Sequence, residues 1–326
     1  RKIVNSSAKI YESSYRSSLL KQAESEFDFI NRNNIKPIYY TDSTYPGRLL
    51  ECDDAPLMLY TLGNCDLNQA RMVGIVGTRH ATHYGIDFTN RFVDELASLI
   101  DNAVIVSGLA YGIDITAHRA AMRNKIPTIA VLAHGLNTIY PADHRKDAAD
   151  ISHIGGMLVT DYRSCDAVHR GNFVARNRIV AGLCDCLVVV ESAQKGGALI
   201  TATIASDYNR DVFAVPGRIY DRFSAGCNKL IASNVAALVE SAADVVAAMR
   251  WPIRPSHDPV PTLPIELDDD DRRIIDYLTD HDDATINRMT VDLNTPVAQL
   301  MSHLIDMEFR GLLTALPGGR YRLKQA

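Results

Sequence analysis

The sequence from Met72 to Met249 repeats one pattern, a short unbroken apolar run followed by a stretch with helical spacing. A strand that is apolar along its whole length has both faces buried, because successive side chains point to opposite sides of a sheet. Such strands, when they alternate with helices, form parallel sheets that helices cover on both faces. The pattern therefore predicts an α/β fold with a doubly wound, mainly parallel sheet over residues 71–249. The apolar runs are MVGIVG, AVIVSG, PTIAVL, GMLVT, CLVVVE and DVFAVPG.

Three further segments flank this region. We interpret residues 1–70 as a lead-in, helical over residues 12–33, followed by a packing arm. Residues 250–264 include WPIRPSHDPVPTLP, whose five prolines continue neither a helix nor a strand, so this segment is predicted to be a linker. Residues 265–326 hold three helical stretches and a hairpin that turns at Gly318 and Gly319, the order of a winged helix-turn-helix domain.

The charges are unevenly distributed along the chain. The net charge is −5, and the residues from Thr262 onward hold twelve acidic and seven basic side chains, which leaves 27 of each in the first 261 residues. An anion site in the larger part must therefore be a local cluster. The third helical stretch of the tail carries Asp306 and Glu308 but no Lys or Arg before Arg310, so binding to duplex DNA is not favoured there over binding to protein.

The apolar runs and the cysteines indicate the setting of the protein. The longest apolar run falls far short of the ~20 residues of a membrane helix, and no signal peptide opens the chain. We therefore expect a cytoplasmic protein with no membrane partner. The six cysteines are scattered and show neither a disulfide framework nor zinc-ligand spacing, so we expect reduced thiols and no metal.

Four of the predicted strands end in loops that combine glycine with basic or polar residues. The carboxyl ends of parallel strands lie at one edge of the sheet, where α/β proteins bind ligands. Glycines at such positions are also common in plain strand-to-helix turns, so each loop alone indicates little. The loops are GTRHATHYG with Arg79, SGLAYGID with Gly108, HGLNTIYPADHR with Arg145, and SAQKGGALITA with Lys195, Gly196 and Gly197.

The stretch RGNFVARNR, which precedes the strand CLVVVE, places three arginines around one aromatic residue. Arginine is rarely buried unless it is paired. The cluster is therefore either neutralised internally, for example by Asp161 or Glu191, or available to an anion. Single-stranded nucleic acid needs this mixture, since its phosphates bind cations and its bases stack on aromatic or guanidinium planes. The cluster consists of Arg170, Phe173, Arg176 and Arg178.

Seven motifs, in their order and spacing over roughly residues 35–245, resemble the DprA/Smf family of DNA-processing proteins. The resemblance implies an extended Rossmann-like domain that binds single-stranded DNA, loads the RecA recombinase in natural transformation, and forms a homodimer. It implies a mediator with no catalytic residues and no cofactor, and a winged-helix tail as in many members. The helical domain that often precedes the Rossmann-like part would be represented here by residues 12–33. The motifs are GIVGTRHATHYG, SGLAYGIDITAH, GLNTIYP, NFVARNRIVAGL, GGALITATIA, FAVPG and GCNKLI.

The resemblance, carried over by motif, implies which residues contact DNA. Arg79, Arg145 and Arg170 would bind phosphates, and Phe173 would offer a face to a base. Lys195 and the glycine amides beside it would hold another phosphate, although the family more often has Ser-Gly-Ser where this chain has Gly-Gly-Ala. The complete predicted set is Arg79, Gly108, Arg145, Arg170, Phe173, Arg176, Asn177, Arg178, Lys195, Gly196, Gly197 and Asn228.

The alternative from another class is an enzyme similar to nucleotide phosphoribohydrolases. In that case GGALITA would hold a nucleotide phosphate, and Glu191 would activate water. We disfavour this alternative because no second catalytic acid is evident and the RNR cluster would have no role. A dinucleotide oxidoreductase is weaker still, since GTRHATHYG lacks the G-x-G-x-x-G spacing.

Overall fold

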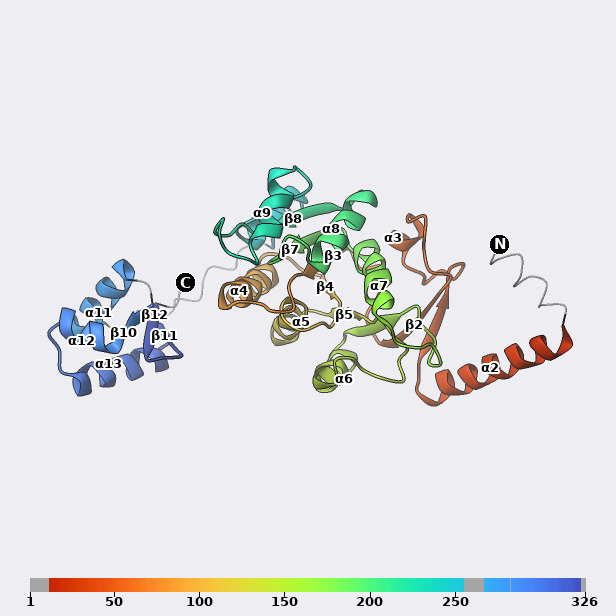
Figure 1. Cartoon of the computed structure of the whole chain (residues 1–326), viewed down its shortest axis with the longest axis horizontal. Coiled ribbons are helices and arrows are strands. Elements are labelled where there is room, and N and C mark those ends of the chain that lie inside the picture. The colour runs from red at the N-terminus through yellow and green to blue at the C-terminus, as the bar shows by residue number, and fades with distance from the viewer. Residues whose placement is uncertain (1–11, 255–266, 282, 324–326) are drawn as a thin grey trace. The chain divides into compact units, whose positions relative to one another are not determined.

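A computed structural model describes residues 12–254, 267–281 and 283–323 of the chain. The chain divides into two compact units, residues 1–255 and 256–326, and each is described by itself (Figure 1). Most of the segment predicted to be a linker, from residue 255 onward, lies outside the described residues, as do the first eleven residues of the predicted lead-in.

A nine-stranded sheet forms the centre of the first unit, in the order β1-β2-β6-β5-β4-β3-β7-β8-β9. All neighbours from β6 to β9 along this order are parallel, whereas β2 is antiparallel to both β1 and β6. The predicted doubly wound and mainly parallel sheet is confirmed. The strands are β1 (Lys36–Tyr39), β2 (Met58–Gly63), β3 (Arg71–Val76), β4 (Ala103–Ser107), β5 (Thr128–Val131), β6 (Met157–Thr160), β7 (Cys186–Val189), β8 (Asp211–Ala214) and β9 (Ala237–Leu238).

Helices cover both faces of this sheet (Figure 1). Every residue of β4, β5, β6 and β7 is buried, as continuous apolar strands require. None of the described helices is long and apolar enough to cross a membrane. One face holds α4 (His83–Leu99), α5 (Ile113–Arg123), α6 (Arg145–His153) and α10 (Ala242–Ala248), and the other holds α3 (Gly47–Leu50), α7 (Arg170–Leu183), α8 (Gly197–Asp207) and α9 (Ala225–Ala232).

Residues 36–63, which we expected to form part of a packing arm, add two strands to the sheet. β1 and β2 form an antiparallel pair, and β2 joins β6 in a register that places Tyr60 opposite Thr160. The preceding helix α2 (Ser13–Arg32) is anchored by Glu26, whose carboxylate accepts hydrogen bonds from the amide and hydroxyl of Ser164. These short strands escape the sequence pattern because β1 lies at the sheet edge, where exposed polar residues and Pro37 are tolerated.

The described residues of the second unit form three helices and a small sheet in the order β10-β12-β11, so the predicted winged helix-turn-helix is confirmed. Its hairpin turns at Gly318 and Gly319, both with positive φ angles. The core of the unit includes Leu300, Leu304 and Met307. The elements are α11 (Asp269–Asp280), β10 (Ala284–Thr285), α12 (Ile286–Asp292), α13 (Val297–Phe309), β11 (Leu313–Leu316) and β12 (Arg320–Leu323).

The cysteines are free thiols, and all but the exposed Cys165 are buried. Burial raises the pKa of Cys65 and of Cys227 to about 12, so both remain protonated at neutral pH. This arrangement agrees with the predicted reduced core thiols.

Candidate nucleic-acid interface

The loops that follow the parallel strands are joined to one another by backbone hydrogen bonds at the carboxyl edge of the sheet. Thr78 N donates to Glu191 O (2.7 Å), and Ile113 N donates to Thr78 O (3.2 Å). Farther along the same edge, Ser192 N donates to Phe223 O (2.6 Å). The connections from β3 and β7 leave in opposite directions, so this edge contains the topological switch point at which α/β sheets bind ligands.

Two glycines allow these loops to approach closely. Gly112 has a φ angle of 77°, and a Cβ atom there would lie 2.2 Å from the carbonyl oxygen of Thr78. A Cβ atom on Gly108 would lie 2.5 Å from a nitrogen of the Arg176 guanidinium. A side chain at either position would separate the loops or displace Arg176. Gly108 therefore admits a guanidinium, in addition to allowing a tight turn.

Arg176, one of the predicted DNA contacts, lies beneath the loops and is only 4% exposed. Its Nη1 donates to the carbonyl oxygen of Gly108 (2.6 Å) and to that of Val131, at the ends of β4 and β5. Burial lowers the pKa of Arg176 and raises the pKa of Asp114, and each of these charges opposes the shift of the other. Asp114 also accepts a hydrogen bond from Gly108 N (3.2 Å). This geometry favours a role in which Arg176 orients the loop after β4.

Arg178 and Asn228 are also engaged within the fold. Arg178 Nη2 lies 2.6 Å from Asp161 Oδ2, and Nη1 donates to the carbonyl oxygen of Asp54 (2.5 Å). This is the internal neutralisation that the sequence left open. The Asn228 amide donates to Gly217 O (2.9 Å) and accepts from Gly217 N (3.2 Å), which holds the loop after β8. Both side chains therefore support the interface, and contact with DNA through them stays a prediction.

Four of the predicted cations are exposed along the carboxyl edge. One belongs to the loop after β3, two are the first residues of α6 and α7, and one precedes α8. The start of α6 is held beside the loop after β4, since a ring nitrogen of His144 lies 2.9 Å from Leu109 O. Their exposure leaves these side chains accessible to phosphate. They are Arg79, Arg145, Arg170 and Lys195.

The remaining predicted contacts differ in what they can offer. Gly196 N already donates to Ala193 O (3.0 Å), so its amide is committed within the loop. Gly197 is exposed at the first position of α8, where helix amides favour anions. Asn177 is partly exposed on α7.

Phe173 lies in the first turn of α7, where it is partly exposed. The central carbon of the Arg79 guanidinium is 5.4 Å from the centroid of the Phe173 ring. The ring of Tyr140, which is 50% exposed, meets Phe173 edge to face with 5.4 Å between centroids. Arg79, Tyr140 and Phe173 form what we call the Phe173 platform. The sequence pointed to Phe173 and Arg79 but missed the role of Tyr140.

A second aromatic group, which the sequence analysis missed, lies across the loop after β3. The guanidinium carbon of Arg222 is 5.5 Å from the Phe223 ring centroid, and the His80 ring stacks on Phe223 with 6.5 Å between centroids. We call His80, Arg222 and Phe223 the Phe223 platform. Because Arg79 and His80 are consecutive, the two platforms flank the same loop. The dipeptide RF, four residues before the GCNKLI motif, was the available signal.

A cavity of about 290 Å³ adjoins the Phe223 platform and bears on the enzyme alternative. Glu191, one of its lining residues, is 3% exposed. Its two carboxylate oxygens accept hydrogen bonds from Thr82 N (2.9 Å) and Thr82 Oγ1 (2.5 Å), at the start of α4. Since both oxygens hold the start of a helix, the geometry weighs against Glu191 as the base of a phosphoribohydrolase. The lining residues are Thr82, Tyr84, Glu191, Asp221, Arg222, Phe223 and Ser224.

Known proteins resemble this chain over both units. The family described as DNA recombination-mediator protein A matches residues 36–250, and the DprA winged helix domain matches residues 258–319. The chain is 40% identical over 210 residues to DNA processing protein DprA of Streptococcus pneumoniae, and this match covers 64% of this chain and 73% of that protein. It is 32% identical over 310 residues to protein Smf of Escherichia coli, and this match covers 94% of this chain and 82% of that protein. A solved structure of DNA processing protein A from Helicobacter pylori, described for its single-stranded DNA binding mode, is similar with a TM-score of 0.59 and 28% identity, over 66% of this chain and 95% of that one.

The buried position of Arg176 predicts that Arg176→Met lowers the free energy of unfolding by about 3 kcal/mol, because Asp114 is left as an uncompensated buried charge. Denaturant unfolding followed by circular dichroism measures the change. Arg170→Met, an exposed substitution on the same helix, should change the stability by less than about 0.5 kcal/mol. Equal stability of the two variants would contradict the anchoring role of Arg176.

Proposed function

This chain belongs to the DprA/Smf family of DNA-processing proteins, and on that premise we propose that it binds single-stranded DNA along the carboxyl edge of its sheet. The observation that carries the proposal is the pair of aromatic and cationic platforms on either side of one loop. Binding of single strands requires neutralised phosphates and stacked bases, and it needs no contacts to base edges. The carboxyl edge offers both kinds of group within one set of loops.

The role that we propose for each residue depends on how exposed its side chain is. Exposed Arg79, Arg145, Arg170 and Lys195 neutralise phosphates, together with the amide of Gly197. The electrostatic attraction on a phosphate comes from the cations at this edge and not from the net charge of the unit, because the first 261 residues hold equal numbers of acidic and basic side chains. The supporting residues, which hold the loops in place, are Gly108, Arg176, Arg178, Gly196 and Asn228.

Bases stack on the two platforms in this proposal. Phe173 carries the first base, with Arg79 placed to contact the adjoining phosphate. Phe223 carries a second base on the other side of the loop, beside Arg222 and His80. A ring face accepts any base, so this arrangement predicts little sequence preference. Asn177 lies on α7 with Phe173 and is a candidate for a polar contact to the same nucleotide.

We further propose that the protein is a mediator, acting in natural transformation, which protects incoming DNA and delivers it to the RecA recombinase. A protein that makes no contacts to base edges binds DNA of any sequence. This lack of sequence preference suits a mediator that has to accept any incoming strand. Family membership supports this role and also the proposal that two copies associate through the Rossmann-like unit. We propose no covalent step, since both carboxylate oxygens of Glu191 hold the start of α4 in place.

Arg79→Ala should weaken binding to oligo(dT) and should reduce the slope of log affinity against log salt by roughly 0.7, the value for one lost single-strand phosphate contact. Fluorescence anisotropy at several salt concentrations measures both quantities. Arg123→Ala is the matched control, since Arg123 is paired with Asp94 at the far end of α5. A folded Arg79→Ala protein with unchanged affinity and slope would remove Arg79 from the interface.

Phe173→Ala and Phe223→Ala should each weaken oligo(dT) binding by about 1–3 kcal/mol and leave the salt slope unchanged, because stacking involves no charge. Phe309→Ala is the control, since it removes a ring that is 88% exposed on the second unit. Thermal unfolding of each variant separates a lost platform from a lost packing contact. Normal binding by Phe223→Ala beside weakened binding by Phe173→Ala would restrict the interface to the Phe173 platform.

The mediator role predicts that the protein accelerates assembly of RecA on DNA coated with single-strand binding protein, because it holds a strand that RecA must reach. The rate of RecA ATP hydrolysis reports assembly. Light scattering on the protein alone, without RecA or DNA, should give roughly twice the chain mass of 36.0 kDa. No acceleration by a protein that binds oligo(dT) normally would contradict the mediator role alone, and a monomer mass would contradict the dimer alone.

A further inference from the structure

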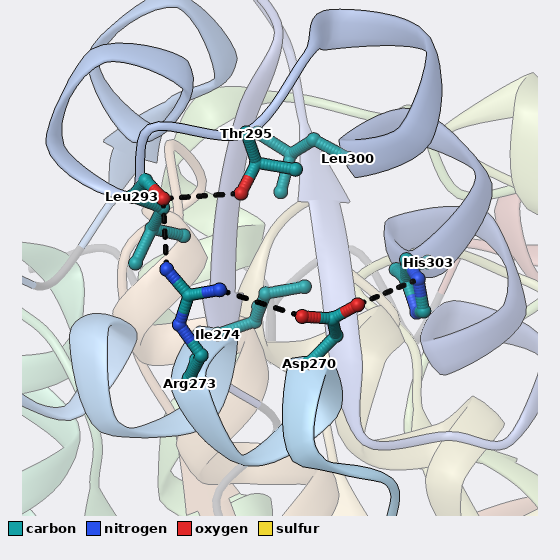
Figure 2. A pocket seen from close by; sticks show the side chains of 7 residues that line it. All are labelled: Asp270, Arg273, Ile274, Leu293, Thr295, Leu300 and His303. Carbon is teal, nitrogen blue, oxygen red and sulfur yellow. Dashed lines mark hydrogen bonds and ion pairs between the residues drawn. The ribbon is translucent and has the colours of Figure 1, made fainter.

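Three ligand-type side chains meet in the second unit, on elements that carry none of the residues proposed to bind DNA. Asp268 caps α11, Asp271 belongs to its first turn, and His303 lies on α13. One carboxylate oxygen of each aspartate and a ring nitrogen of His303 lie within 4.8 Å of one another. Figure 2 shows His303 facing the start of α11, where it also contacts Asp270.

Asp271 supplies an independent indication of a ligand. The side chain is only 1% exposed, and its Oδ2 pairs with Arg310. Its Oδ1 has no hydrogen-bond partner among the described residues. His303 Nδ1 lies 3.5 Å from this oxygen, an ion-pair distance without the geometry of a hydrogen bond. A buried carboxylate oxygen without a partner is costly, so a group that binds it would be favoured.

Each aspartate uses one oxygen in the fold and directs the other toward His303. Asp268 Oδ1 accepts the hydrogen bond from Asp271 N (2.7 Å) that caps α11, while its Oδ2 lies 4.0 Å from His303 Nδ1. Asp271 gives Oδ2 to Arg310 and leaves Oδ1 for the cluster. Asp268 Oδ2, Asp271 Oδ1 and His303 Nδ1 are therefore positioned by the fold but take no part in the helix cap or in the pair with Arg310.

The local charge is suited to a divalent cation. Among the described residues, the cluster and its ion-pair partners hold four carboxylates and two guanidiniums, which leaves two negative charges when His303 is neutral. Arg310 and the positive end of the α11 dipole oppose a cation, so we expect micromolar affinity. The carboxylates are Asp268, Asp270, Asp271 and Asp306, and the guanidiniums are Arg273 and Arg310.

The distances and the ligand types favour zinc. Tetrahedral ligands about 2.0–2.1 Å from zinc are roughly 3.3–3.5 Å apart. The separations from His303 Nδ1 are 3.5 Å to Asp271 Oδ1 and 4.0 Å to Asp268 Oδ2, so small side-chain movements complete the geometry. Magnesium prefers six oxygen ligands, and imidazole suits zinc. A cavity of about 10 Å³, with room for about one water molecule, also borders His303 (Figure 2).

We propose that Asp268, Asp271 and His303 bind a zinc ion that links α11 to α13. The ion neutralises the excess carboxylate charge and binds Asp271 Oδ1, which has no hydrogen-bond partner within the described part of the chain. Because α11 and α13 both contribute to the core of the second unit, the ion stabilises that unit.

The test is calorimetric titration of the full chain with zinc chloride after treatment with EDTA. All proteins carry Cys165→Ser, since Cys165 is the exposed thiol. Asp268→Asn removes a charged ligand but keeps a helix cap, because asparagine caps as well as aspartate. His303→Gln removes the nitrogen ligand. His281→Gln is the matched control, since His281 stacks on Tyr277 and lies outside the cluster.

We expect one zinc site with micromolar affinity in the parent protein and in His281→Gln, and at least tenfold weaker affinity in Asp268→Asn and His303→Gln. Magnesium should bind at least tenfold more weakly than zinc. Zinc should also raise the melting temperature of the parent but not of His303→Gln. The proposal is overturned if zinc binds all four proteins with the same affinity. It is also overturned if none of them binds zinc at a concentration of about 100 μM, which is 100 times a micromolar dissociation constant. If Asp268→Asn does not fold, His303→Gln decides.

Discussion

The buried guanidinium of Arg176 joins α7 to the ends of β4 and β5, and the carboxyl edge of the sheet is built around it. A charge in this position costs free energy unless it is compensated, and Asp114 together with two carbonyl oxygens provides the compensation. Gly108 is required because any Cβ atom there would collide with the guanidinium. One buried group thus sets the position of the loop after β4 and the start of α7, from which Phe173 reaches the surface.

The supporting contacts explain how a unit without excess positive charge can present a basic edge. Arg178 is neutralised by Asp161, and Arg176 is compensated within the core, so neither adds to the accessible charge. The predicted cations that remain exposed lie in loops after strands or begin helices; they are Arg79, Arg145, Arg170 and Lys195. Their number is small, so aromatic stacking has to contribute a large part of the proposed affinity for single strands.

The second unit differs from the first because its charged side chains are mainly acidic. Its third helix carries Asp306 and Glu308, which are engaged by Arg310 and by the amide of Ala315. The start of α11 adds several carboxylates, one of them buried. An acidic winged-helix domain does not attract phosphate, and the same charge makes it a suitable place for a cation. The cluster with His303 was not predictable from cysteine and histidine spacing, because its ligands come from α11 and α13 and meet only in the folded unit.

The sequence by itself determined the parallel sheet, the winged-helix domain and the family, because continuous apolar strands, helical spacing and ordered motifs are local properties of the chain. It also proposed Arg79, in the loop after β3, and Phe173, in the first turn of α7, as DNA contacts, and both contacts stay predictions. Only the tertiary structure decided that Arg176 is buried, that Asn228 clamps a loop, that β2 pairs with β6, and that Tyr140 and Phe223 complete two platforms. The physical reason is that burial, pairing and stacking depend on partners that are distant in sequence, and the same arginine is an anion site or a structural anchor according to which groups surround it.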